Sequence, residues 1–276
     1  MKRSHTLHLV TTYIILIAYF TFLLLPILWV TYSSFKDASV INSSMIWPGF
    51  KHLTVMNYIR TISLADFPRV ILNTLIIALG TTVLTVTIAT LAAYSASRIQ
   101  FLSKASLLTV VSSQMYPYVL VMIPFYMIMM RLGLVDKYIG IILTHTVIAL
   151  PFSLWMLKGY FDRVPKNLDE AAYIDGCGHI KVLTRIILPI SAPGLAVVAF
   201  FAFMVSWGDY LFVSILSQSK ATTTLTILLQ TFMVGRRIQW EILSTATVIC
   251  IVPTIILFSI AQKWLVEGLM AGAVKE

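Results

Sequence analysis

The sequence predicts an all-helical membrane protein with six transmembrane helices, organised as a single transmembrane domain over residues 1–276. The chain is 59% hydrophobic and only 11% charged, with a mean hydropathy of +0.90. A chain of that composition cannot present a water-soluble surface. Its charges are also clustered, and the uncharged stretches between the clusters match the roughly 20 apolar residues that a spanning helix needs.

Six stretches have the required length, and each is bounded by Lys, Arg, His, Asp or Glu. We expect spans at 9–33, 70–95, 105–130, 138–158, 187–212 and 242–263. These stretches are apolar on all sides, whereas a membrane barrel would show segments of about 10 residues with alternating polarity. Helices also satisfy their backbone hydrogen bonds within one segment, as the bilayer requires.

The first span could be confused with a secretory signal, because Lys2 and Arg3 precede an apolar run. The run is longer than the apolar core of a signal and contains Pro26, Trp29 and Tyr32. It does not end in a small-x-small cleavage pattern. We therefore interpret it as a membrane anchor.

The distribution of basic residues favours a multi-pass protein of the inner (plasma) membrane with both termini in the cytoplasm. In that topology the inner segments hold 11 of the 20 Lys and Arg residues, five of them between Lys158 and Arg185. The net charge of +9 comes from residues that flank spans. Anionic membrane lipid is the partner that such residues meet, and no nucleic-acid role is expected.

The connections between spans include three long ones, and function is expected there. They run from Lys36 to Arg69, from Lys158 to Arg185 and from Asp209 to Glu241. The third contains an uncharged stretch, Ala221 to Gly235, which is too short to cross the bilayer. That stretch is expected to lie along the interface or to form a re-entrant element.

The loop over 159–186 is expected to contain a short helix with clear start and end signals. Asn167 is placed to be the N-cap, and Glu170 follows three residues later, where a capping box has an acid. Ala171 and Ala172 leave a smooth face that a partner backbone can approach, and Gly176 is suited to end the helix in a left-handed conformation.

This loop resembles the signature loop of binding-protein-dependent ABC importer permeases. The shared pattern is Glu-Ala-Ala, three residues, Gly, nine residues, Ile, one residue, Leu-Pro. Its fixed positions are filled in register by Glu170, Ala171, Ala172, Gly176, Ile186, Leu188 and Pro189. The resemblance implies the type I importer permease architecture, with the loop between the fourth and fifth of six spans.

The same resemblance implies a division of labour. This chain would supply half of the channel, a second homologous permease the other half, and a dimeric cytoplasmic ABC ATPase the energy. An extracytoplasmic sugar-binding protein would deliver the cargo. The docking surface for the ATPase would comprise Glu170, Ala171, Ala172, Asp175 and Gly176. ATP and Mg would bind to the ATPase, since no G-x-x-x-x-G-K-[ST] phosphate loop occurs among the twelve glycines. The plainer alternative is that Glu170 and Gly176 only cap a surface helix.

Further stretches are similar to the carbohydrate (maltose-type) branch of that family. They are Asn73-Thr74-Leu75, Arg131-Leu132-Gly133-Leu134 and the tail from Lys263 to Lys275. The branch differs from this chain at Cys177, where alanine is commoner, and at Gly208-Asp209, where an Asn-Glu pair is more usual. A di- or oligosaccharide is the expected cargo, and polyols, glycerol phosphates and uronates stay open.

Candidate residues for the substrate pathway are polar or aromatic groups near the ends of spans. Asp209, flanked by Trp207 and Tyr210, combines a hydrogen-bond acceptor with ring faces that suit a sugar, although the aromatic pair could equally belong to an interfacial belt. Asn73 and Gln114 are weaker candidates, because such residues more often join helices. His145 is expected to hydrogen-bond within the protein, since its own span contains no acid.

Two other functional classes fit the sequence less well than the importer does. A secondary, ion-coupled transporter would more typically carry acids within its spans, whereas here every Asp and Glu lies at or outside the span ends. An intramembrane enzyme has no support from an HExxH or G-x-S-x-G motif. The two cysteines, Cys177 and Cys250, have no metal-binding spacing. Neither a catalytic site, a cofactor site nor a metal site is expected in this chain.

Overall fold

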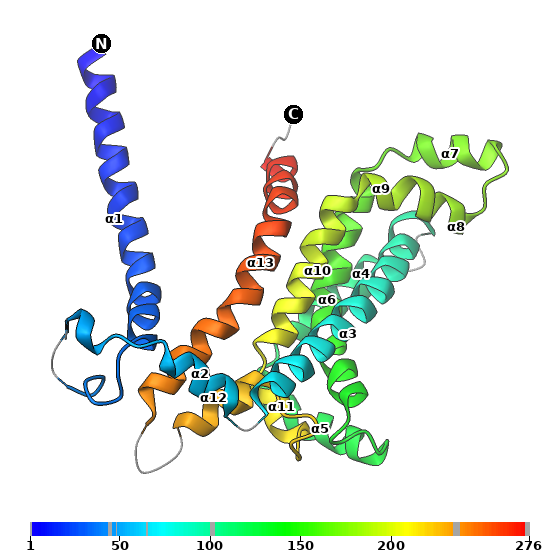
Figure 1. Cartoon of the computed structure of the whole chain (residues 1–276). Helices are drawn as coiled ribbons and strands as arrows, with labels where there is room; N and C mark the ends of the chain where they lie inside the picture. The colour runs from blue at the N-terminus through cyan, green and yellow to red at the C-terminus, as the bar shows by residue number, and fades with distance from the viewer. Residues whose placement is uncertain are drawn as a thin grey trace. The chain divides into compact units, whose positions relative to one another are not determined.

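The computed structural model describes residues 2–43, 46–47, 49–64, 66–99, 103–233 and 238–273 (Figure 1). Within these ranges the chain is helical, with one isolated antiparallel bridge between Lys36 and Leu53 and no β-strand. The all-helical class is therefore confirmed. By internal contacts the chain forms two compact units, Met1–Phe67 with Leu229–Val252 and Pro68–Leu228 with Pro253–Glu276.

The first unit is built from the first helix, the loop that follows it and parts of the last two helices. It contains α1 (Lys2–Ser34), a 3-10 turn (Phe50–His52), α2 (Met56–Ser63), the end of α12 (Leu225–Met233) and the beginning of α13 (Trp240–Ala273). Residues 9–29 of α1 are all exposed in the isolated chain. Because this surface is apolar, lipid or another protein must cover it in the membrane.

The second unit holds the remaining helices. They are α3 (Phe67–Tyr94, continued by a π-helical turn to Ile99), α4 (Lys104–Ser112), α5 (Tyr118–Arg131), α6 (Tyr138–Arg163), α7 (Lys166–Ile174), α8 (His179–Val182), α9 (Leu188–Ile190), α10 (Ala192–Trp207) and α11 (Leu211–Leu216). The first part of α12 and the end of α13 also belong to it.

Helix α6 is the central element of the second unit. It packs along α10, where Gly194 lies so close to Tyr160 that an added Cβ would come within 2.5 Å of the ring. Leu157 and Phe161 of α6 are fully buried and form one cluster with Val182 and Ile187. Val182 comes from the loop expected over 159–186 and Ile187 directly follows that loop, so the loop is anchored on the spans by apolar packing.

Four of the predicted spans are continuous helices and two are bent. The continuous ones are Leu9–Ser34, Phe67–Ile99, Tyr138–Arg163 and Trp240–Trp264. The bent pairs are Ala105–Met115 with Tyr118–Arg131, at 101°, and His179–Ile190 with Ala192–Trp207, at 84°. The chain therefore has six candidate spans when each bent pair counts as one.

Proline explains the bends in the spans expected over 105–130 and 187–212. Tyr116 precedes Pro117 and is extended, with ψ of 132°, because a residue before proline is sterically excluded from the helical region. Ser191 interrupts the second pair, and Pro193 begins a new helix there. That helix ends at Trp207, and α11 begins separately at Leu211.

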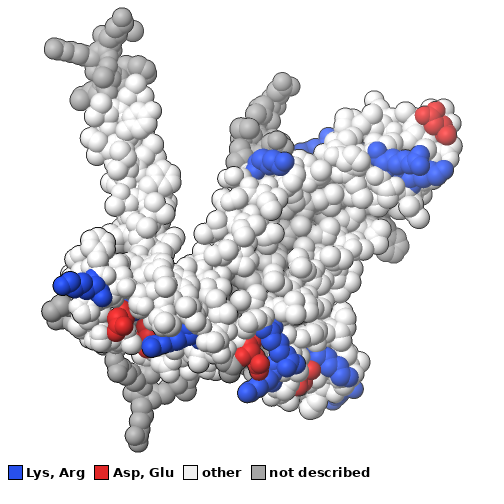
Figure 2. Space-filling view, viewed as in Figure 1, with Lys and Arg blue, Asp and Glu red and all other residues white. Residues whose placement is uncertain are grey.

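Charged side chains mark the two ends of the second unit. Figure 2 shows Lys, Arg, Asp and Glu gathered around α7 and α8 and again beyond the other end of α6, with an uncharged surface between them. The described residues that form the second group include Arg131, Asp136 and Lys137. This separation is the pattern of a segment that crosses a bilayer.

Candidate functional site

The 159–186 loop places most of its predicted docking residues at the surface. Glu170, Ala171, Asp175 and Gly176 are exposed, whereas Ala172 is only 6% exposed and packs in the cluster of Leu157 and Phe161. The smooth face expected from both alanines is therefore wrong for Ala172. A helix turns by about 100° per residue, so adjacent alanines cannot both face outward on a half-buried helix.

The ends of α7 match one prediction and correct another. Gly176 has φ of +78°, the left-handed conformation expected of a helix-ending glycine. Asn167, however, is not the N-cap, because α7 already begins at Lys166 and Pro165 occupies the cap position without a side-chain hydrogen bond. The φ of Pro165, −57°, suits entry into a helix, so proline rather than a capping box sets the start.

A buried ion pair ties α7 to the second span. Arg98 Nε lies 2.5 Å from Asp169 Oδ2, and the two side chains are 4% and 6% exposed. The Arg98 guanidinium also donates through Nη2 to the carbonyl of Val164, at 2.8 Å. Neither the partner of Asp169 nor the role of Arg98 was predicted from the sequence. The available signal was the position of Arg98 at the end of a span that ends on the same side as the loop.

Polar contacts continue this attachment on both sides of the ion pair. Ser97 donates to Asp162 at 2.6 Å, which joins the end of α3 to the end of α6. Tyr173 of α7 lies 2.8 Å from His179 Nδ1 of α8. The loop is therefore attached to the ends of α3 and α6 by several polar contacts.

Exposed apolar side chains lie beside the predicted docking residues. Ile174 of α7 is 87% exposed and Ile180 of α8 is 78% exposed. These two side chains add apolar surface to the same two helices.

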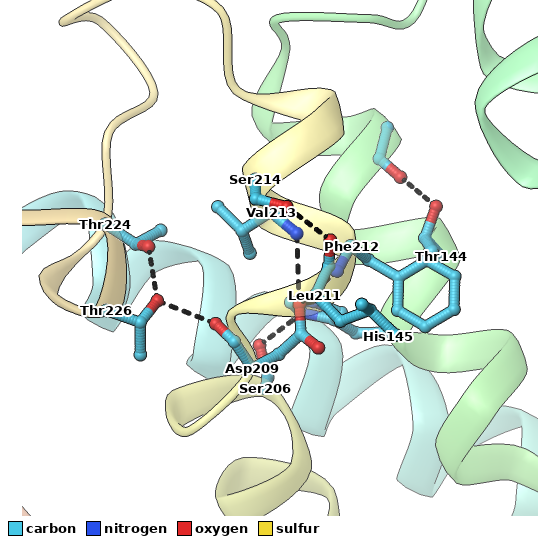
Figure 3. Close-up of polar contacts among 11 residues, drawn as sticks. Thr144, His145, Ser206, Asp209, Leu211, Phe212, Val213, Ser214, Thr224 and Thr226 are labelled. Atoms are coloured by element: carbon cyan, nitrogen blue, oxygen red, sulfur yellow. Dashed lines mark hydrogen bonds and ion pairs between the residues drawn. The ribbon is translucent and has the colours of Figure 1, made fainter. Parts of the chain in front are cut away.

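At the other end of the second unit, Asp209 is the centre of a polar network (Figure 3). Its Oδ2 accepts hydrogen bonds from the backbone N–H groups of Phe212 and Val213, both at 3.0 Å, and so caps the first turn of α11. The same oxygen lies 3.1 Å from His145 Nε2, and His145 Nδ1 lies 2.8 Å from the hydroxyl of Ser206. With its proton on Nε2, the imidazole donates to Asp209 and accepts from Ser206.

The aromatic neighbours of Asp209 do not join it in one open surface. Trp207 is only 7% exposed and stacks on Phe203, with ring centroids 5.3 Å apart. Tyr210 is 44% exposed. Of the three residues that the sequence groups together, Tyr210 alone presents a substantial surface, and the hydrogen bonds of Asp209 are made within the protein.

Asn73 holds the loop between α11 and α12. It is 1% exposed, its amide Nδ2 donates to the carbonyls of Ala221 at 3.0 Å and Thr223 at 2.9 Å, and its Oδ1 accepts from the hydroxyl of Tyr138 at 2.6 Å. Thr74 accepts from the backbone N–H of Leu225 at 2.9 Å. These contacts give Asn73 a positioning role.

Asp136 also holds the loop between α11 and α12 in place, and the sequence did not predict this role. Its Oδ1 accepts from the backbone N–H groups of Gln218 and Ser219, both at 3.1 Å, and from the Thr222 hydroxyl at 2.5 Å. Burial alone would raise the pKa of Asp136, but these hydrogen bonds outweigh it and lower the pKa below the ordinary value.

Gln114 lies at the bend between α4 and α5. It donates to the carbonyl of Ile148 at 3.3 Å and lines a cavity of about 200 Å³ together with Tyr116 and Tyr118. The ring of Tyr118 lies 6.2 Å from that of Phe212, in the first turn of α11. The cavity therefore adjoins the helix that Asp209 caps.

Within the described residues, no group of three or more His, Cys, Asp or Glu side chains could hold a metal ion. The polar clusters at both ends of the second unit are built from hydrogen bonds and ion pairs. They position helices and loops.

Comparison with known proteins yields one family. Residues 85–270 match the family described as binding-protein-dependent transport system inner membrane component. The chain is 35% identical to the trehalose/maltose transport system permease protein MalG of Thermococcus litoralis, over 91% of each chain. It is 41% identical to the maltodextrin transport system permease protein MdxG of Bacillus subtilis, over 74% of each chain.

Two further similarities extend over most of the chain. The sulfoquinovosyl glycerol transport system permease protein SmoH of Agrobacterium fabrum is 32% identical over 91% of this chain and 89% of its own length. The fold is shared with a chain of a bacterial ABC transporter that imports the acidic polysaccharide alginate, with a TM-score of 0.83 and 19% identity. That match covers 95% of this chain and 98% of the other.

Proposed function

The chain belongs to the family of inner membrane components of binding-protein-dependent transport systems, and from this premise we propose that it forms half of the channel of an ATP-driven carbohydrate importer. It is a multi-pass membrane permease subunit. The observation that carries the proposal is the loop from Glu170 to Pro189, whose signature residues are in register and whose helix α7 is fixed to the spans by the Arg98–Asp169 pair.

The cargo in this proposal is a di- or oligosaccharide. Relatives with 35% and 41% identity are permeases of trehalose/maltose and maltodextrin systems. A third, at 32% identity, belongs to a system for sulfoquinovosyl glycerol, which is a glycoside with an acidic group. The proposed class is therefore glycosides, with room for an acidic member.

The energy would come from a separate ATPase dimer that binds ATP and Mg. Helix α7 would lie in a groove of one ATPase subunit, with Glu170, Ala171, Asp175 and Gly176 at the contact and Ala172 supporting it from the core. The exposed side chains of Ile174 and Ile180 would supply apolar area. Closure of the ATPase pair would then move α7 together with α3 and rock the two membrane halves between inward and outward access.

The partners would be a second homologous permease and an extracytoplasmic sugar-binding protein, with both termini of this chain in the cytoplasm. The apolar, fully exposed surface of α1 over residues 9–29 supports a protein or lipid neighbour. The substrate pathway would be lined by Tyr210 and by the cavity at Gln114, while Asp209, Trp207 and Asn73 hold the surrounding helices and loop in place.

The test is uptake into proteoliposomes that contain the chain with its co-purifying permease and ATPase, driven by internal ATP and an added binding protein. We expect uptake of a labelled oligosaccharide that vanadate blocks and that a protonophore or sodium ionophore leaves unchanged. Glu170→Lys should abolish uptake, whereas Asn167→Lys, at another exposed position of the same loop, should retain it. Uptake that collapses with the ion gradient and ignores vanadate would instead support an ion-coupled carrier.

A further inference from the structure

Lys36, in the first unit, is a buried cation that the proposed coupling and gating do not use. It follows α1 and is only 3% exposed. Its ammonium lies 4.6 Å from the ring centroid of Trp29 and 4.6 Å from that of Tyr32. Among the described residues no carboxylate lies within ion-pair distance of it. Burial lowers the pKa of Lys36, so a bound anion would compensate a charge that the protein itself leaves without an acidic partner.

The backbone beneath Lys36 is held in place by the same unit. Asn57 is 1% exposed and its amide donates to the carbonyls of Ser34 at 2.9 Å and Lys36 at 2.8 Å. Thr245, from α13, donates to the Ser34 carbonyl at 3.2 Å. The amine is thus presented from a fixed segment, and little ordering would be needed when a ligand binds.

A cavity of about 370 Å³ opens beside this amine. Its lining residues include Trp29, Trp240, Asn42, Ser33, Ser43 and Ser244. The two indoles are 45% and 44% exposed. Ring faces suit the apolar face of a sugar, amide and hydroxyl groups suit its hydroxyls, and the volume lies within the roughly 300–1,000 Å³ of small-molecule sites.

We propose that this cavity binds an acidic sugar, with the carboxylate or sulfonate of a pyranoside on the amine of Lys36 and the sugar ring against Trp29 and Trp240. The proposal rests on the proposed function, because it takes the ligand from the carbohydrate class. It adds an acid-recognising site at the end of the first span.

A lipid headgroup is the competing occupant, since tryptophan and lysine also gather at membrane interfaces. A lysine that serves a membrane interface places its ammonium in water at the end of an apolar stem. Lys36 instead has its ammonium over two rings and 3% exposure. The lining also contains four residues with a hydroxyl or amide group, which suit the hydroxyls of a sugar ring; they are Ser33, Asn42, Ser43 and Ser244.

The experiment measures binding of trigalacturonate and of neutral maltotriose to the purified full-length chain in its complex, by titration calorimetry in phosphatidylcholine nanodiscs. We expect Lys36→Met to weaken trigalacturonate binding about ten- to hundredfold and to leave maltotriose unchanged. Lys36→Arg, which keeps the charge, should retain most of the affinity. Lys51→Met, at an exposed lysine of the same loop, is the matched control and should change neither.

Unchanged trigalacturonate binding in Lys36→Met would overturn the proposal. Loss of trigalacturonate binding by the wild-type chain in phosphatidylglycerol nanodiscs would also overturn it, because the anionic lipid would then occupy the site. If Lys36→Met unfolds, Trp240→Leu replaces it and should weaken trigalacturonate binding; no effect would overturn the proposal. In either case the wild type should still take up neutral sugar when ATP is supplied. The acidic-sugar site can therefore be disproved while the proposed function is retained.

Discussion

The two ends of the second unit hold their loops with carboxylates in two different ways. At the loop of α7, Asp169 pairs with a buried guanidinium, that of Arg98. At the other end, Asp136 and Asp209 accept hydrogen bonds from backbone N–H groups and neutral side chains. A buried pair is costly to break on one side only, whereas a cap can be replaced by another acceptor. The difference indicates a stiff mechanical link at one end and an adjustable loop anchor at the other.

The largest expected effect comes from breaking the buried pair. Asp169→Ala should lower the free energy of unfolding by about 3–5 kcal/mol, because Arg98 is left buried without a counter-charge. The double variant Arg98→Met with Asp169→Leu should recover most of that loss. Thermal unfolding of the purified chain in detergent measures both. Equal destabilisation in the single and double variants would show that the unpaired charge of Arg98 is not the cause of the loss of stability.

The next effect tests the anchor at Asp136. Asp136→Ala should cost about 1–3 kcal/mol, since three donors lose a charged acceptor. Proteolysis of the 217–224 loop gives the readout, and Asp136→Asn should be the milder change. The exposed, helical Asn167→Ala is a suitable control. If the 217–224 loop of that control is also cleaved faster, the effect is due to general destabilisation of the chain.

The lowered pKa of Asp136 also predicts a pH dependence. A carboxyl whose folded pKa lies below its unfolded value stabilises the fold at pH above the unfolded pKa, and this contribution is lost as the pH falls through the folded pKa. The wild type should therefore lose stability on acidification below the ordinary range of a carboxyl, and Asp136→Asn should lose less. Parallel acid-unfolding curves for the two chains would contradict this assignment.

A smaller effect is expected at Gly176. Gly176→Val places a β-branched residue at φ of +78°, and an added Cβ there meets open space, so backbone strain of about 1–2 kcal/mol is the only cost. Gly178→Val, in the same turn but with φ of −82°, is the control and should be nearly neutral. Backbone strain should lower the unfolding temperature of Gly176→Val. A steric conflict with a partner protein would instead reduce uptake and leave the unfolding temperature unchanged.

The smallest effect distinguishes positioning from substrate contact at Asp209. Asp209→Asn keeps an oxygen that can accept from the N–H groups of Phe212 and Val213, so α11 should stay capped. Half-saturation of uptake should change little in this variant and should rise in Tyr210→Ala. A large rise in Asp209→Asn at unchanged stability would instead place the carboxylate on the cargo.

Local pattern predicted the elements of this fold that depend on local physics. The long uncharged stretches predicted six spans, and the candidate spans of the structure account for each of them. The glycine of the signature loop predicted the left-handed turn at Gly176. Prolines lie next to the bends at Tyr116 and Ser191 and indicate a break in the helix. Hydropathy does not detect such a break, because a bent span is as apolar as a straight one.

Which residues meet across the fold could not be deduced from one sequence. His145 and Asp209 lie 64 positions apart and Arg98 and Asp169 lie 71 apart, and either acid could have faced water. For the same reason the burial of Ala172 and the hydrogen bonds of Asn73 to Ala221 and Thr223 could not be predicted. The direction of a side chain depends on the rotation of its helix against its neighbours, and that rotation follows from the packing of all helices together.

The sequence by itself therefore determined that the chain is a helical membrane permease, that it has six apolar stretches long enough to span, and that the loop at Glu170 carries the family signature. Apolar length and local turn chemistry are sufficient for that. Only the tertiary structure decided that Arg98 fixes α7, that Asp209 caps α11 rather than standing open, and that Lys36 faces an indole-lined cavity. Those are contacts between distant segments, and they exist only once the helices have packed.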